Sequence, residues 1–111
     1  MLSKSNRLKQ KKDIERVIKR GESFKEKFLV LKTAKNSLSQ SRFGFIVSQK
    51  VSKKATIRNK IRRKLREIVK RKIKSLKFYR DNLIIVLPGT DNKTFREIEE
   101  TTTILFKKAR L

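Results

Sequence analysis

The chain has 111 residues, with 33 lysines and arginines against 10 acidic residues, which gives a formal net charge of +23. It contains no histidine and no cysteine, and this excludes imidazole-based catalysis, disulfides and thiolate metal sites. Neither a membrane-length apolar run nor the apolar segment of a secretory signal is visible, so we expect a single cytoplasmic domain, no membrane association and a polyanionic partner.

The N-terminal part of the chain predicts an arm and a short helix. Residues 1–10 are polar and basic, so we expect a flexible arm at the start of a single RNA-binding domain that spans 1–111. Residues 11–20 carry apolar side chains at positions i, i+3 and i+4, and Gly21 follows as a typical helix stop. The apolar edge of this helix is too narrow to stand alone, so the helix should pack on a sheet.

Two stretches predict strands. Residues 24–35 are rich in β-favouring side chains and predict one strand, or a short strand followed by a longer one. After a polar turn, residues 42–48 predict another strand, in which Phe43 and Phe45 share one face. These rings could stack on unpaired bases, although aromatic residues of a small domain more often belong to its core.

The uninterrupted segment 53–79 predicts a long amphipathic helix, because its apolar residues recur at spacings of three and four. Ser52 is its expected N-cap. A neighbouring stripe of the same helix carries mainly arginine, a permanently charged, forked donor that suits phosphate, and Glu67 is the only acid in the segment. The stripe is a candidate surface for binding a polyanion, although a charge run can also be merely solvated.

The last part of the chain predicts a strand and a helix. Residues 83–87 form an apolar run typical of a strand buried on both faces, and it can lie parallel to the preceding strand because a helix joins the two. Thr94 and Glu97 predict a capping box. The inner face of the final helix should carry Ile98, Thr102, Leu105, Phe106 and Ala109. We therefore expect an α+β two-layer sandwich, with helices covering one face of a mixed sheet.

The acidic residues offer little for catalysis. Only Glu97, Glu99 and Glu100 cluster, and they occupy the end of a helix where acids are structurally favourable. A stand-alone Mg²⁺-dependent nuclease that uses this cluster is one alternative. A structural, ribosomal-type RNA-binding protein with no role in cleavage is another, and the composition fits it equally well.

The segment KVSKKATIRNKIRRKLR, residues 50–66, resembles the signature of the bacterial ribonuclease P protein subunit. The resemblance extends to RLKQKKDIERVIKRGESFKEKFLVL, RFGFIVSQKVSKK and FYRDNLIIVLPG, and so covers essentially the whole chain. It implies the order αβββαβα, a mixed four-stranded sheet and a left-handed βαβ crossover through the long helix, a ribosomal protein S5 domain 2-like fold.

The resemblance also implies a function. The subunit would bind the catalytic RNA of ribonuclease P and the 5′ leader of precursor tRNA, and would assist endonucleolytic removal of the leader to give the mature tRNA 5′ end. Catalysis would belong to the RNA and its Mg²⁺ ions. The protein, a monomer by itself, would then need no catalytic residue, no metal site and no tightly bound cofactor.

Two sets of residues are carried over from the resemblance. The first would contact the catalytic RNA: Lys50, Lys53, Lys54, Arg58, Asn59, Lys60, Arg62, Arg63 and Arg66. The second would form a leader-binding cleft between the first helix and the sheet: Ile14, Ile18, Phe28, Val30, Lys32, Phe43 and Phe45. The chain departs from the usual family pattern at Ile14 and Ile18, where phenylalanine is common, and at Lys60, where arginine is common.

Overall fold

A computed structural model describes residues 2–111. Its main elements are α1 (Lys11–Arg20), β1 (Glu22–Glu26), β2 (Leu29–Lys35), β3 (Arg42–Val47), α2 (Ala55–Lys72), β4 (Arg80–Val86) and α3 (Phe95–Lys108). Short 3₁₀ helices lie at Lys4–Asn6, Ile73–Ser75 and Thr90–Asn92. The predicted order αβββαβα is confirmed, and the stretch 24–35 forms the second of its two alternatives, a short strand and a longer one.

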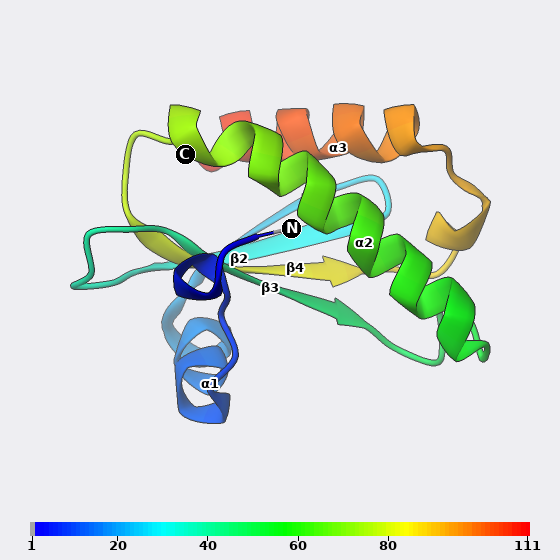
Figure 1. Cartoon of the computed structure of the whole chain (residues 1–111), viewed down its shortest axis with the longest axis horizontal. Coiled ribbons are helices and arrows are strands. Elements are labelled where there is room, and N and C mark those ends of the chain that lie inside the picture. Colours follow the sequence, from blue (N-terminus) through cyan, green and yellow to red (C-terminus); the bar gives the residue numbers. More distant parts are fainter. Residues whose placement is uncertain (1) are drawn as a thin grey trace.

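The four strands form one mixed sheet in the order β1-β2-β4-β3. β1 pairs with β2 and β2 with β4 in antiparallel fashion, whereas β3 and β4 are parallel. α2 carries the chain from β3 to β4 above the sheet, and this crossover is left-handed (Figure 1). The left hand is rare among βαβ connections, so the hydrophobic pattern alone could not have predicted it.

The helices lie on both faces of the sheet. α2 and α3 cover one face, and α1 packs on the other (Figure 1). β4 allows this because both of its faces are apolar: Ile84 and Val86 enter the main core, while Leu83 and Ile85 pack towards α1. The expectation that the helices share one face therefore holds for α2 and α3 and is wrong for α1.

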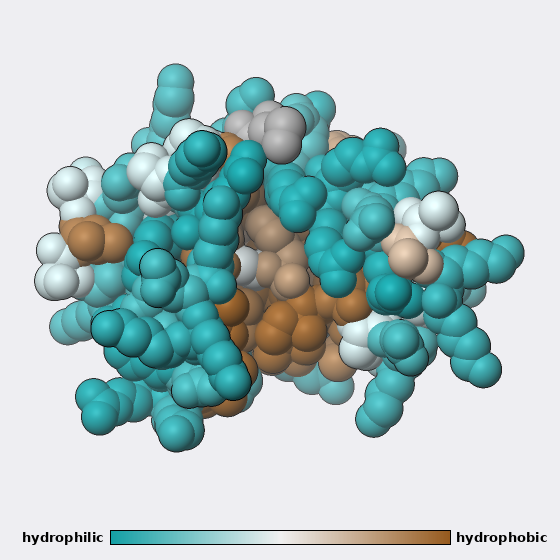
Figure 2. Space-filling view, turned by 60° about the horizontal axis from the view of Figure 1, so that its bottom comes forward, coloured by the Kyte–Doolittle hydropathy of each residue, from teal (hydrophilic) through white to brown (hydrophobic). Residues whose placement is uncertain are grey.

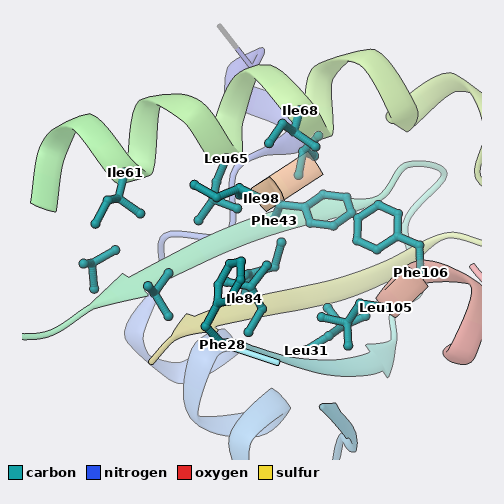
Figure 3. Close-up of a cluster of buried hydrophobic side chains, with 14 of the residues drawn as sticks. Phe28, Leu31, Phe43, Ile61, Leu65, Ile68, Ile84, Ile98, Leu105 and Phe106 are labelled. Atoms are coloured by element: carbon teal, nitrogen blue, oxygen red, sulfur yellow. The ribbon is translucent and has the colours of Figure 1, made fainter. Parts of the chain in front are cut away.

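The main core lies between the sheet and the helices α2 and α3 (Figure 3). Leu65 and Ile68 of the amphipathic stripe of α2 are fully buried, as its period predicted. The ring of Phe43 stacks on that of Phe106 of α3, with centroids 5.7 Å apart and planes 25° apart. The aromatic face of β3 is therefore turned towards the core.

The N-terminal segment, expected to be a flexible arm, packs along the sheet. Leu2 and Leu8 are buried, and the backbone N–H of Leu8 donates to the carbonyl oxygen of Phe43 over 2.9 Å. Arg7 forms an isolated parallel bridge with Phe43, so the segment covers the edge strand β3. The expectation is therefore corrected for residues 2–8, and residue 1 lies outside the described part of the chain.

The helix ends differ in part from the prediction. α2 begins after Lys54 rather than being capped by Ser52, and it passes at Ile73 into a 3₁₀ turn instead of continuing towards residue 79. The capping box of α3 is confirmed, because the side chains of Thr94 and Glu97 each accept a hydrogen bond from the other residue's backbone N–H. Among residues 2–111, no helix combines the length and apolarity that crossing a membrane requires.

Candidate nucleic-acid interface

The arginine stripe of α2, which we define as Asn59, Arg62, Arg63 and Arg66, begins beside the end of β3. Arg62 donates from Nη1 to Oδ1 of Asn59 over 2.8 Å, and from Nη2 to the carbonyl oxygen of Val47 over 3.4 Å. These contacts hold the Arg62 guanidinium beside the sheet while it remains partly exposed. The long side chain therefore presents its charge in a restricted position, which lowers the conformational entropy lost on binding phosphate.

A groove of about 390 Å³ lies between the stripe, β3 and the N-terminal segment. Arg62 and Arg66 line it from α2, Arg7 and Lys9 line it from the N-terminal segment, and Phe45 contributes apolar surface. This arrangement combines guanidinium and ammonium groups with an aromatic side chain, as surfaces for RNA commonly do. Arg7 and Lys9 were missed in the sequence; the apolar residues of the same segment, Leu2 and Leu8, were the available signal.

A second hollow, of about 430 Å³, lies on the other side of Arg66 and is lined by Asn59, Arg63, Arg66 and Glu67. Residues of the arginine stripe therefore line two concave surfaces, and Arg66 lines both of them. Arg58 has a different position, because its Nη1 donates to the carbonyl oxygens of Ser52 and Lys53 over 2.9 and 3.0 Å. It braces the connection before α2. The remaining predicted contacts are exposed lysines beside the stripe: Lys50, Lys53, Lys54 and Lys60.

Some of the residues predicted for the leader cleft lie on the α1 side of the molecule. Four of its seven residues lie there: Ile14, Ile18, Val30 and Lys32. Val30 pairs with Ile85 and Lys32 with Leu83, and directly paired residues of neighbouring strands share a face. Figure 2 shows this side, where apolar surface gathers in a hollow between hydrophilic side chains. We call this surface the apolar hollow.

The three phenylalanines of the predicted cleft do not lie in the apolar hollow. Phe28 and Phe43 are buried in the main core, and Phe45 packs against the same core. For Phe43 and Phe45 the reason is strand alternation: Gly44 and Ile46 face α1, so the residues beside them face α2 and α3. The prediction that these rings line a cleft with the first helix is therefore wrong, although Phe45 does line the groove beside Arg62.

The acids of the α3 cluster have structural partners. Glu97 completes the capping box, and the pKa of its carboxyl is lowered chiefly by the hydrogen bond from the backbone of Thr94. Glu99 pairs with Arg71 over 3.5 Å, and Glu100 accepts a hydrogen bond from Arg96 over 3.0 Å. Within residues 2–111, no three potential metal-ligating side chains gather in one place.

Comparison with known proteins gives one consistent result. The family model of Ribonuclease P matches residues 2–110. The chain is 32% identical to the ribonuclease P protein component of Syntrophomonas wolfei over 100% of this chain and 92% of that protein, and 34% identical to that of Clostridium botulinum over 96% of each. Both comparisons span the arginine stripe.

Solved structures agree with the sequence comparisons. The RNase P protein of Staphylococcus aureus superposes with a TM-score of 0.88 at 30% identity, covering 96% of this chain and 97% of that one. The RNase P protein of Thermotoga maritima gives a TM-score of 0.83 at 29% identity, covering 92% and 96%. None of these matches favours the ribosomal-type alternative. The chain, with its left-handed crossover and its arginine stripe, belongs to the bacterial ribonuclease P protein family, the tRNA-processing subunit that partners the ribonuclease P RNA.

Proposed function

We propose that this chain uses its two surfaces for two RNAs: the groove at the arginine stripe for the catalytic RNA, and the apolar hollow beside α1 for the 5′ leader of precursor tRNA. The observation that carries the proposal is their separation on one small domain. Arg62 and Arg66 line a charged groove next to α2, whereas Ile14 packs with apolar side chains on the opposite face of the sheet. A chain with both can hold an RNA helix and an unpaired strand at once.

The division of labour follows from the side chains. The arginine stripe neutralises phosphates without taking part in bond making, and it would lower the Mg²⁺ concentration that the RNA needs. The chemistry would be supplied by the RNA and its Mg²⁺ ions. The hollow would add affinity for precursor over mature tRNA, which lacks the leader, and a single protein molecule in the cytoplasm would suffice for both contacts.

The test is cleavage of 5′-labelled precursor tRNA at low Mg²⁺, compared for protein alone, catalytic RNA alone and the two together. We expect cleavage at the mature 5′ end only when both are present. Cleavage by protein free of RNA would move the activity to a protein site. If the protein leaves cleavage by its RNA unchanged, it is an RNA-binding protein without a part in this reaction.

Replacing Ile18 with aspartate should weaken the binding of precursor tRNA to the reconstituted enzyme about 5- to 20-fold, because the change removes an apolar contact and adds a charge that repels the leader. Ile18 is 44% exposed, so the fold should tolerate the change. Binding of mature tRNA should not change, and equilibrium binding of both RNAs measures the difference.

The matched control is Ile104→Asp on α3, where the isoleucine is 39% exposed and lies far from α1 in the fold. This variant should bind precursor tRNA as the wild type does. Equal weakening by the two variants, or equal weakening for precursor and mature tRNA, would mean that the hollow does not receive the leader.

A further inference from the structure

A basic pocket of about 350 Å³ lies behind α1, and neither predicted RNA surface includes it. Arg16 and Arg20 line it from α1, Lys35 from the end of β2 and Arg80 from the start of β4, with Glu22 as the one acid. Its walls therefore carry four positive charges against one negative charge. An excess of this kind in a concave site attracts an anion.

α1 separates this pocket from the apolar hollow. One side of α1 carries Ile14, which packs on the apolar face of the sheet. Its other side carries Asp13 and Arg16, which pair with Arg42 and Asp81 at the starts of β3 and β4. The pocket lies on this second side, at the end of the sheet, so a group bound there does not compete with one in the hollow.

Two arginines that line the pocket each carry a donor without an acceptor. The Nε–H groups of Arg16 and Arg80 are buried and find no hydrogen-bond partner among the described residues. Arg16 uses a terminal nitrogen for Asp81, and that carboxylate already accepts bonds from Arg42 and Asn36. A buried donor on a charged group costs free energy when it has no acceptor. An oxyanion that accepts a hydrogen bond from each of the two arginines would therefore lower the free energy of the protein.

An aromatic side chain beside the pocket indicates where the oxyanion comes from. The guanidinium carbon of Arg80 lies 5.7 Å from the centre of the Phe78 ring, and Phe78 is 53% exposed. Tyr79, the residue between them, is 58% exposed. An open ring next to a phosphate-binding arginine is typical of proteins that hold unpaired nucleic acid, where a base stacks on the ring.

We propose that this pocket binds one phosphate group of an RNA backbone through Arg16 and Arg80, with Lys35 and Arg20 contributing charge and Phe78 stacking on the adjacent base. The phosphate site rests on the geometry alone. The assignment of the phosphate to an RNA rests on the function proposed above. The pocket gives the protein a third point of attachment, on the side of α1 away from the leader.

The phosphate site can be tested directly on the full chain by nuclear magnetic resonance of the arginine Nε–H groups. Inorganic phosphate is titrated at constant ionic strength against chloride, so that general charge screening does not change. We expect the Nε–H signals of Arg16 and Arg80 to shift and saturate, and that of Arg96, whose side chain is 87% exposed on α3, to stay in place. Shifts that do not saturate, or that are equal at Arg96, would overturn the site.

A matched pair of variants tests whether the pocket's charge matters. Lys35→Gln should weaken phosphate binding severalfold, because it removes one of the lining charges. Lys107→Gln removes an equal charge from an exposed position on α3 and should leave binding unchanged. Equal effects of the two variants would mean that phosphate responds only to the net charge of the chain.

A second titration with a short single-stranded RNA identifies the source of the phosphate. The oligomer should move the same two signals, and Phe78→Ala should weaken its binding about tenfold while leaving inorganic phosphate binding unchanged. If phosphate moves the signals and RNA does not, the RNA assignment is wrong and the pocket takes a free anion. The cleavage test is independent of the phosphate titration. If the pocket binds no phosphate, the protein should still assist cleavage of precursor tRNA. If the protein does not assist cleavage, the titration still shows whether the pocket binds phosphate.

Discussion

Asp81→Asn should lower the free energy of unfolding by about 3–5 kcal/mol, the cost typical of breaking a buried ion pair from one side. The Asp81 side chain is fully buried. Arg42 donates to both of its oxygens, from Nε over 2.8 Å and from Nη2 over 2.7 Å, while Arg16 and Asn36 bind the same carboxylate. An asparagine of the same size removes the counter-charge of Arg16, leaves Arg42 only its longer contact with Asp13, and turns an amide N–H₂ towards one of the two guanidinium groups.

Urea unfolding followed by circular dichroism, at neutral pH and fixed salt, measures this loss. The control is Asp91→Asn, an exposed aspartate after β4, which should change the free energy of unfolding by less than about 0.5 kcal/mol. The two variants lose the same charge, so they share any effect of the higher net charge. Similar stabilities for the two would show that the buried network contributes little.

The pKa of the Asp81 carboxyl also predicts how the free energy of unfolding depends on pH. Burial by itself raises the pKa of Asp81, but the hydrogen bonds from Arg42 and Asn36 and the charges of Arg42 and Arg16 outweigh it, so the pKa is lowered. The stabilisation is therefore present above the unfolded carboxyl's pKa, about 4, and is lost as the pH falls through the lower pKa of the folded protein. Wild-type stability should fall in that acidic range, and the fall should be shallower in Asp81→Asn.

The sequence predicted those features that depend on neighbours along the chain. The period of α2 predicted its buried face, including Leu65 and Ile68, and the pair Thr94 and Glu97 predicted the start of α3. The left-handed crossover came only from the resemblance, because the periodicity of a helix between two parallel strands is the same for either hand.

Features that depend on distant residues could not be predicted. Strand alternation placed Phe43 and Phe45 on one face, but both faces of the sheet are apolar, so nothing in the pattern decided which face α1 would cover. The ion pair of Arg16 with Asp81 joins residues that are 65 positions apart. Because this contact cannot be seen in the sequence, the sequence predicted neither the buried network around Asp81 nor the basic pocket beside α1.

Replacing both Arg62 and Arg66 with alanine should strongly weaken the binding of the protein to the catalytic RNA. Both line the groove at the arginine stripe, and each is expected to neutralise one phosphate. The slope of log affinity against log salt should become less negative by about 2, since each phosphate contact contributes about 0.9. At 0.1 M salt this corresponds to roughly hundredfold weaker binding. Equilibrium binding over a range of salt concentrations measures both quantities.

The control is a double variant, Lys74→Ala with Lys107→Ala, which removes two exposed charges outside the groove. It lowers the net charge equally, so it reproduces any long-range attraction that the arginine variant loses, and its salt slope should change little. Arg62 and Arg66 are partly exposed, so their loss should leave the fold intact. If both double variants flatten the slope equally, the RNA is attracted by the charge of the whole chain, and the arginine stripe is no more than one part of a uniformly basic surface.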